Sequence, residues 1–178
     1  PVLVAVVNET YEYRVTAIDP DGDRLTIAAT AKPAWANLSG SGNGQALLHG
    51  KPPENALGNT PVTLSASDGS GVAQQTFNVF VNVRPSLTSL FAATEEDLTV
   101  TFIANFFAAG YSDRNDNPLE SILITSLPVS GRLVVSDQEV KAGDTIATAS
   151  LSQLVYEPDE NFFGEDAFNW NAFDGYHY

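Results

Sequence analysis

Short alternating strands, separated by turn residues, constrain the fold of this chain more than any other feature. Residues 11–17 alternate apolar and polar side chains, which is the period of a half-buried strand, and residues 72–83 repeat it with Phe77, Val79 and Val81 on one face. Turn residues interrupt the chain about every 8–12 residues. Only residues 105–110 are expected to form a helical turn. The pattern predicts an all-β protein built from β-sandwiches.

The strands are expected in two groups of similar layout. In the first group they occupy residues 2–7, 11–17, 25–27, 45–48, 61–66 and 72–83. In the second group they occupy residues 98–103, 122–125, 133–135, 145–148, 151–156 and 167–173. Residues 39–44 hold three glycines and are expected to form a loop, and Ser67–Gly71 carries a hairpin-turn signal.

A linker is expected at Arg84-Pro85-Ser86, which gives modules at residues 1–84 and 85–178. Asp174-Gly175 in the second module mirrors Asp68-Gly69 in the first. The sequence then stops at Tyr178, where the first module continues into its closing strand. We therefore expect the second sandwich to lack its last strand, or to receive that strand from another source.

Two acidic clusters lie at matching places in the modules, at Asp19–Asp23 and Asp113–Asn117. Like charges about 5 Å apart repel by roughly 3 kcal/mol at an effective dielectric constant near 20. Such a cluster is either fully solvated, as a polar turn, or neutralised by a cation. Calcium is the best-suited cation, because it takes about six to eight oxygen ligands from carboxylates, Asn side chains and carbonyls. An EF-hand is excluded, since the twelfth position from Asp19 is Thr30 and not Glu.

The charge balance restricts the partners of this chain. Eight Lys and Arg residues against 22 Asp and Glu residues give a formal net charge of −14. Nucleic acids and anionic membranes are polyanions that require basic patches, so we expect no nucleic-acid partner. No apolar run approaches the length of a membrane span, so we expect no membrane insertion. Cysteine is absent, and metal can replace disulfides as a staple. Because the chain starts at Pro1 and contains no Met or signal peptide, we expect a piece of a longer polypeptide.

The motifs of both modules resemble known families. The first module resembles the dystroglycan-type cadherin-like, Ig-related domains, through residues 11–25, Pro33-Ala34-Trp35, Gly50-Lys51-Pro52 and 66–69. The second module is similar to the bacterial cadherin-like repeats of large surface proteins, through residues 95–97, 127–133, 140–146, 154–158, 161–168 and Asp174-Gly175. These resemblances imply tandem Greek-key sandwiches of the Ig/cadherin-like type, with calcium at the junctions between modules.

The cadherin-like resemblance also implies a set of calcium ligands. A first group of ligands would lie at the free top of module one, at Asp19, Asp21, Asp23 and Asp68. A second group would combine the bottom of module one with the top of module two, at Glu9, Glu54, Asp113, Asn115, Asp116 and Asp174. A third group would face a following module, at Glu96, Asp159 and Glu160. The linker departs from the family pattern, because Val83–Ser86 lacks the acidic motif of animal cadherins and Arg84 introduces a cation.

Catalytic motifs are absent from the sequence. The two histidines, His49 and His177, have no accompanying nucleophile elbow, metalloprotease helix or phosphate-binding loop. Nothing distinguishes a catalytic carboxylate pair among the 22 acids. The chain is therefore predicted to be non-enzymatic.

Three functions are open at this point. The leading prediction is a calcium-rigidified structural or adhesive pair of modules from a bacterial cell-surface or secreted protein, with neighbouring modules as partners. A second is a carbohydrate-binding pair attached to a polysaccharide-degrading enzyme, with Trp35 and Tyr111 as the aromatic platforms to test. A third is a homophilic adhesive contact, including strand exchange at the incomplete carboxyl end.

Overall fold

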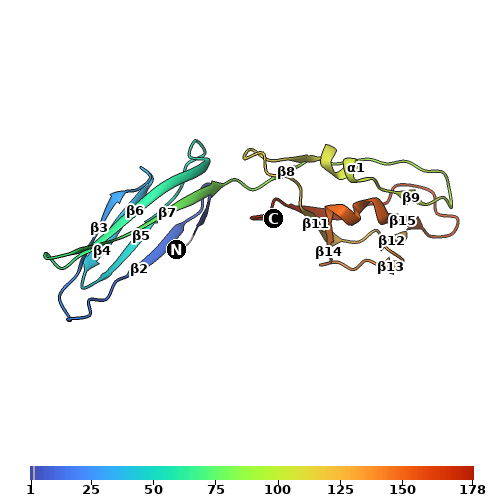
Figure 1. Cartoon of the computed structure of the whole chain (residues 1–178). Coiled ribbons are helices and arrows are strands. Elements are labelled where there is room, and N and C mark those ends of the chain that lie inside the picture. Colours follow the sequence, from blue (N-terminus) through green and yellow to red (C-terminus); the bar gives the residue numbers. More distant parts are fainter. Residues whose placement is uncertain (2) are drawn as a thin grey trace. The chain divides into compact units, whose positions relative to one another are not determined.

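The computed structural model describes residue 1 and residues 3–178, and these residues form two compact units, unit 1 (Pro1–Val83) and unit 2 (Arg84–Tyr178). Most of the regular secondary structure in both units is strand (Figure 1). The fold is all-β, as the strand pattern predicts, and of the Ig/cadherin-like type that the family resemblances imply. Among the described residues, no helix is long and apolar enough to cross a membrane.

Unit 1 is a sandwich of two sheets. Its strands are β1 (Val4–Val6), β2 (Tyr11–Thr16), β3 (Thr26–Ala31), β4 (Ala36–Gly42), β5 (Gln45–Gly50), β6 (Gly58–Ser67) and β7 (Val72–Asn82). One sheet has the order β1-β7-β6-β3 and the other has the order β2-β5-β4. Strands β1 and β7 run parallel, and the other pairs are antiparallel. This is the Greek-key arrangement of an Ig-like sandwich.

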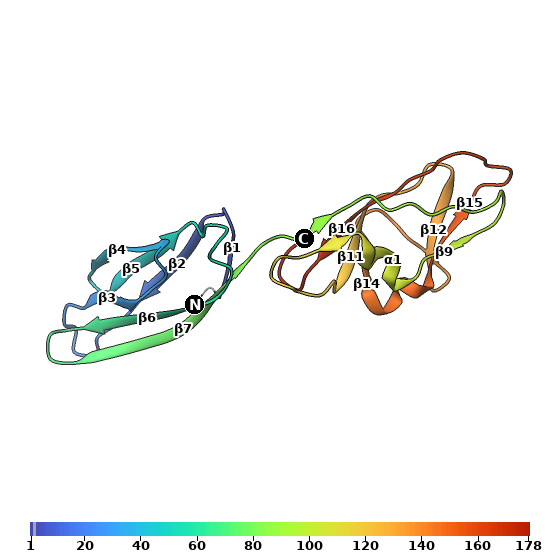
Figure 2. The ribbon, with the colours of Figure 1, turned by 90° about the horizontal axis from the view of Figure 1, so that it is seen from above.

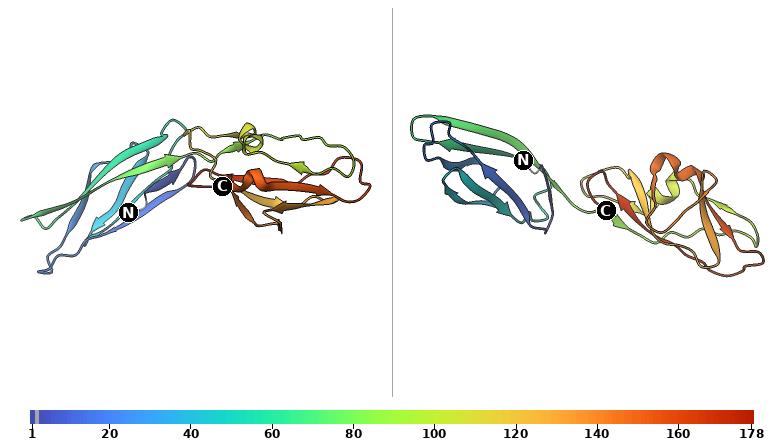
Figure 3. Two further views of the ribbon diagram at one scale, coloured as in Figure 1. Left: turned by 45° about the vertical axis from the view of Figure 1, so that its right-hand side comes forward. Right: turned by 90° about the horizontal axis from the view of Figure 1, so that it is seen from below.

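Alternation of side chains places the core of unit 1 between its sheets. Val62 and Leu64 on β6 and Val79 and Val81 on β7 are fully or almost fully buried. They belong to one cluster with Ala5, Tyr11, Ala36 and Leu48. The hairpin of β6 and β7 runs along the length of this unit (Figure 3).

Residues 39–44, predicted as a loop, are mostly strand. Strand β4 continues to Gly42 and pairs with β5, with a register shift between Ser39 and Gly42 that accommodates the glycines as a bulge. The turn is confined to Asn43 and Gly44, which have φ angles of 57° and 69°. Strand pairing therefore overrides the weak propensity of a Gly-Ser run. At the amino end β1 covers Val4–Val6, and Val2 lies outside the described residues.

Unit 2 has shorter strands. These are β8 (Ser86–Leu87), β9 (Val100–Thr101), β10 (Tyr111–Ser112), β11 (Ser121–Ser126), β12 (Gly131–Val135), β13 (Gln138–Glu139), β14 (Thr145–Ala147), β15 (Leu154–Pro158) and β16 (Asn169–Phe173). The larger sheets have the orders β14-β11-β16 and β13-β12-β15-β9, and β10 pairs with β8.

Helical turns fill the second core. Helix α1 (Ala104–Ala109) inserts Phe107, which is fully buried, and it contacts the 3-10 helix η1 (Thr148–Gln153) (Figure 2). The surrounding apolar cluster comprises Phe102, Ile122, Ile124, Leu133, Val140, Ile146, Leu151 and Leu154. The helical turn predicted at 105–110 is confirmed.

Two predicted strands of the second module are too long. The strand expected at 98–103 is only Val100–Thr101, because Ile103 already caps α1. The strand expected at 151–156 begins at Leu154, since Leu151 belongs to η1. Both errors arise because short apolar runs fit a strand and a buried helical turn equally well.

Candidate metal centre

Strand register places the acidic loop and the aspartate turn of unit 1 at the same end. The loop Asp19–Asp23 leads into β3, and the turn beginning at Asp68 follows β6. Thr26 of β3 pairs with Ser67 of β6. Two acidic segments that are far apart in sequence therefore lie at one end of the sandwich.

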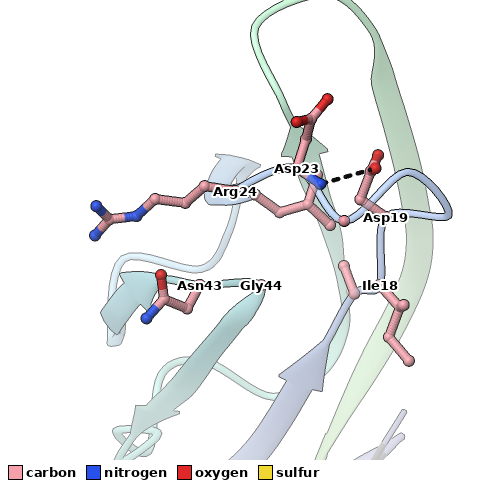
Figure 4. Close-up of a pocket in the computed structure, with 9 residues that line it drawn as sticks. Ile18, Asp19, Asp23, Arg24, Asn43 and Gly44 are labelled. Carbon is pink, nitrogen blue, oxygen red and sulfur yellow. Dashed lines mark hydrogen bonds between the residues drawn. The ribbon is translucent and has the colours of Figure 1, made fainter.

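The Asp19 carboxylate organises its own loop. Its Oδ1 accepts hydrogen bonds from the backbone N–H groups of Asp21 (2.9 Å) and Asp23 (3.1 Å). The bond from Asp23 is drawn in Figure 4. A hollow of about 410 Å³ lies beside the loop. In Figure 4 the side chain of Arg24 extends from the loop toward the hairpin turn that carries Asn43. Asp21 and Asp23 are exposed. This loop has the features of a solvated turn as well as those of a cation site.

Asp68 forms a related motif in the second acidic segment of unit 1. Its Oδ1 accepts hydrogen bonds from the N–H groups of Ser70 (2.7 Å) and Gly71 (2.6 Å). The bonds from Gly71 and Ser70 hold the pKa of Asp68 below its usual value. These backbone donors therefore favour the ionised form of Asp68 without a metal ion.

Unit 2 repeats both motifs. Asp113 Oδ1 accepts hydrogen bonds from the N–H groups of Asn115 (2.8 Å) and Asn117 (3.0 Å). Asp174 Oδ1 accepts hydrogen bonds from Tyr176 (2.7 Å) and His177 (2.6 Å). The pairing of Ser121 on β11 with Phe173 on β16 brings these segments to one end of unit 2.

The acidic centre of unit 2 contains more deeply buried carboxylates than the acidic centre of unit 1. Asp174 is 1% exposed, whereas Asp21 and Asp23 are exposed. The second carboxylate oxygen of Asp113, Oδ2, is buried and has no hydrogen-bond partner among the described residues. A buried acceptor without a partner costs about 1–3 kcal/mol, and more when it is charged. This oxygen is therefore suited to a ligand that supplies positive charge.

Tyr111 is surrounded by acidic side chains at the same end of unit 2. Its hydroxyl donates a hydrogen bond to the Asn117 carbonyl oxygen (2.8 Å). Burial, followed by the charges of Asp113, Asp174 and Glu120, raises the pKa of Tyr111 to about 12. Glu120 was not among the predicted ligands, because no motif marks it. Only the pairing of β11 with β16 brings Glu120 close to the Asp174-Gly175 turn.

The remaining predicted ligands are Glu9, Glu54 and Asp116. Glu9 and Glu54 belong to the opposite end of unit 1, where Asn8 donates a hydrogen bond to the Pro52 carbonyl oxygen (2.9 Å). Asp116 is exposed on the Asp113 loop, with a φ angle of 60°. Within the part of the chain that the structure describes, no three Asp, Glu or His side chains are grouped closely enough to hold a metal ion by themselves. Any site therefore needs further oxygen donors.

Glu96, Asp159 and Glu160 lie at the end of unit 2 opposite to Asp113. One bond connects the segments that carry them, because Asp97 Oδ1 accepts a hydrogen bond from the Asn161 N–H (2.7 Å). The Asp159 N–H donates to the Ser130 carbonyl oxygen (2.9 Å). Asp159 and Glu160 are exposed.

Trp35 and Tyr111, the two candidate sugar-binding aromatics, both contact other parts of the protein. Trp35 packs on the unit 1 core, edge-on to Tyr11 with ring centroids 5.6 Å apart, and its Nε1 is buried. Gly50 makes room for it, since a Cβ there would lie 2.3 Å from the Trp35 carbonyl oxygen. Tyr111 is half-buried. Neither ring forms the open, flat surface that stacks on sugars, so this geometry does not favour the carbohydrate-binding alternative.

Comparison with known proteins agrees with this architecture. The model of a family described as bacterial Ig domain matches residues 1–80. No curated protein matches the sequence. Unit 1 thus has an Ig-like fold and resembles this family over residues 1–80.

Among solved structures, the endo-fucoidan hydrolase MfFcnA4 from glycoside hydrolase family 107 is 20% identical, with a TM-score of 0.43, over 97% of this chain and 26% of its own. Human protocadherin-24 EC1-2 is 12% identical, with a TM-score of 0.37, over 96% of this chain and 89% of its own. The chain thus spans about a quarter of the length of that hydrolase.

Proposed function

We propose that this chain is a pair of calcium-binding, cadherin-like structural modules from a bacterial cell-surface or secreted protein. In this proposal unit 1 is a dystroglycan-type cadherin-like module and unit 2 is a bacterial tandem cadherin-like repeat. Calcium stiffens an array of such modules in the extracellular space. Neighbouring modules of the same polypeptide are the first partners, and a homophilic contact is a further one.

The observation that carries the proposal is the buried, unpartnered Oδ2 of Asp113. The other oxygen of this carboxylate is used by two backbone donors, so the loop is already held in shape. A calcium ion at Oδ2 would supply the partner that this oxygen lacks among the described residues. Candidates for further oxygen ligands at this end of unit 2 are Asp174 or Glu120, the side chains of Asn115 and Asn117, water and backbone carbonyls.

The energetic effect of calcium follows from linkage. An ion that binds only the folded state adds RT ln(1 + [Ca]/Kd) to the free energy of unfolding, or about 2.7 kcal/mol at a hundredfold excess over Kd. Extracellular calcium modules bind at about 10⁻⁴ to 10⁻³ M. The modules would therefore be stiff outside the cell and softer where calcium is scarce.

Asp113→Asn tests the site directly. The Asn side chain keeps an Oδ1 acceptor for the two backbone donors but removes the charge and replaces Oδ2 with an amide. We expect the variant in chelator to melt at or above the temperature of the parent chain. Millimolar calcium, with magnesium as the control ion, should raise the melting temperature of the parent by several degrees and leave the variant unchanged.

The matched control is Asp19→Asn, which makes the same change in the equivalent loop of unit 1. If the calcium-dependent rise survives Asp113→Asn and disappears with Asp19→Asn, the metal belongs to unit 1. Absence of any rise in the parent chain, or an equal rise with magnesium, would contradict calcium binding at both loops.

A further inference from the structure

Three loops meet at the end of unit 2 that lies opposite to the Asp113 loop. The Asn161 N–H donates a hydrogen bond to Asp97 Oδ1 (2.7 Å), which joins the loop after β15 to the loop before β9. The Asp159 N–H donates to the Ser130 carbonyl oxygen (2.9 Å), which joins the loop after β15 to the turn before β12. Figure 2 draws these segments together beyond β9, β12 and β15. Residues from separate parts of the chain therefore form one surface at this end.

Large apolar side chains in these loops are exposed. Val129 is 91% exposed and Phe163 is 82% exposed. Leu98 and Leu127, which are 53% and 38% exposed, lie in the same loops. Single exposed apolar residues are normal on a protein surface, but several on adjoining loops form a patch of the kind that marks an interaction site. We call Leu98, Leu127, Val129 and Phe163 the tip surface.

Hydrogen bonds fix the backbone of the tip surface. Asp166 Oδ1 accepts a bond from the Val129 N–H (2.9 Å), and Asp166 Oδ2 accepts one from the Ser130 N–H (2.8 Å). In the loop after β15, Phe162 is half-buried whereas the neighbouring Phe163 is exposed. Val129 and Phe163 are thus presented by an ordered backbone. A partner that covers them has little loop ordering to offset.

Carboxylates surround the tip surface. The segments that form this end, residues 94–99, 127–131 and 158–168, contain no Lys or Arg. Their exposed acids are Glu95, Glu96, Asp97, Asp159, Glu160 and Glu165. Among the residues that the structure describes, none of these acids is paired with a Lys or Arg. Arg132, on the adjoining strand β12, is already held by Glu157 through its Nε (2.7 Å). The apolar tip surface therefore has a negatively charged rim.

The charge of this rim restricts what can cover the tip surface. An anionic membrane is repelled, and so is a second copy of this chain, because its net charge is −14. Protein interfaces combine an apolar centre with a polar rim, and complementary charges steer the partner into place. A segment that carries both large apolar side chains and Lys or Arg matches the two parts of this surface.

We propose that the tip surface of unit 2 is a docking site for a basic, amphipathic segment of another protein. Apolar side chains of this segment cover Val129 and Phe163. Its Lys or Arg side chains pair with the surrounding carboxylates, among them Glu160 and Glu165. The proposal goes beyond calcium binding and does not depend on it, because the Asp113 loop lies at the other end of unit 2.

The test measures binding of a fluorescein-labelled peptide that alternates Leu and Lys, by fluorescence anisotropy in chelator and low salt. Val129→Ser combined with Phe163→Ser should weaken binding about tenfold or more, because it removes the apolar centre. The matched control combines Ile18→Ser with Val72→Ser, which removes two exposed side chains (87% and 66%) from unit 1. This control should change the affinity by less than about twofold. Unchanged melting temperatures verify that all chains are folded.

The charged rim is tested separately. Glu160→Gln combined with Glu165→Gln should weaken binding of the Leu-Lys peptide and reduce its dependence on salt. Asp21→Asn combined with Asp23→Asn makes the same change of net charge in an exposed loop of unit 1 and should have a smaller effect. If the two pairs have equal effects, only the overall charge attracts the peptide and the proposal is wrong.

Further probes distinguish the other possible occupants. A Ser-Lys peptide, which keeps the charge, should bind the parent chain about tenfold more weakly than the Leu-Lys peptide. Equal binding of these peptides, no binding of the Leu-Lys peptide, or equal losses for the two Ser variants would overturn the proposal. So would binding to phosphatidylcholine vesicles, or a concentration-dependent dimer in sedimentation, that Val129→Ser with Phe163→Ser abolishes. A membrane or a second copy would then be the occupant.

Discussion

At the residue scale, aspartates in this protein act first as acceptors for backbone N–H groups. Asp19, Asp68, Asp113 and Asp174 each use Oδ1 for two such bonds. A carboxylate in this role shapes a loop without any metal. The second oxygen therefore decides whether a ligand is needed, and Asp113 Oδ2 is the buried one without a partner in the described residues.

Asp166 shows the purely structural use of a carboxylate. Its Oδ1 accepts hydrogen bonds from Val129 (2.9 Å) and Ala167 (2.8 Å), and its Oδ2 from Ser130 (2.8 Å) and the Tyr156 hydroxyl (3.0 Å). Asp166→Asn replaces one acceptor oxygen with a donor. We expect a loss of about 1–3 kcal/mol in the free energy of unfolding of unit 2, measured by denaturant titration. Glu165→Gln, an equal change of charge at an exposed neighbour, should be nearly neutral.

The pH dependence of unit 2 should follow Asp166. Burial favours the neutral acid, but the bonds from Val129, Ser130 and Ala167 outweigh it and lower the pKa below the ordinary 3.8. A pKa lowered by folding adds stability that is present above the ordinary value and is lost as pH falls through the lowered one. The parent chain should lose more stability than Asp166→Asn between pH 5 and about pH 3. Equal losses would exclude Asp166 as the group responsible.

At the element scale, the hairpin of β4 and β5 depends on a close approach at its turn. Gly44 donates to the Leu25 carbonyl oxygen (3.0 Å) and accepts from the Ala17 N–H (2.8 Å), so the turn is fixed to both ends of the Asp19 loop. A Cβ on Gly44 would lie 2.3 Å from the Ala17 carbonyl oxygen, and the φ angle of 69° disfavours other residues.

Gly44→Ala should therefore destabilise unit 1 through both strain and crowding. Strain in the left-handed region costs about 1–2 kcal/mol, and overpacking adds about 1–3 kcal/mol. Gly40→Ala is the matched control, since Gly40 has a φ angle of 67° but open space around its Cβ position. In a Trp170→Phe background, which leaves Trp35 as the only tryptophan, denaturant unfolding should show a larger loss for Gly44→Ala. Equal losses would mean that the hairpin turn moves aside freely.

At the scale of the whole molecule, the net charge of −14 opposes folding through self-repulsion. Raising NaCl from 0.01 to 0.15 M shortens the Debye length from about 30 Å to about 8 Å. We expect the melting temperature at pH 7 to rise by about 4 °C, equivalent to roughly 1 kcal/mol. Near pH 4.2, the isoelectric point of the sequence, the rise should vanish. If the salt effect has the same size at both pH values, causes other than net charge produce it.

Much of the fold could be predicted because it depends on local patterns. The alternation at 72–83 predicted β7, and Asp68-Gly69 predicted the turn before it. The lengths of β9 and β15 could not be predicted, since their apolar flanks fit helical turns as well as strands. The Gly-Ser run at 39–44 was also misjudged, because pairing with β5 decides its structure.

Side-chain period and turn chemistry are local properties, so the residues alone predict two acidic loops of equal spacing and the strands that carry them. How these acids differ depends on the folded structure. Pairing of β11 with β16 brings Glu120, Asp113 and Asp174 around Tyr111. Packing at that end buries Asp113 Oδ2, whereas Asp21 and Asp23 of unit 1 are exposed to solvent. Burial depends on neighbours that are distant along the chain, and no motif around a single aspartate records it.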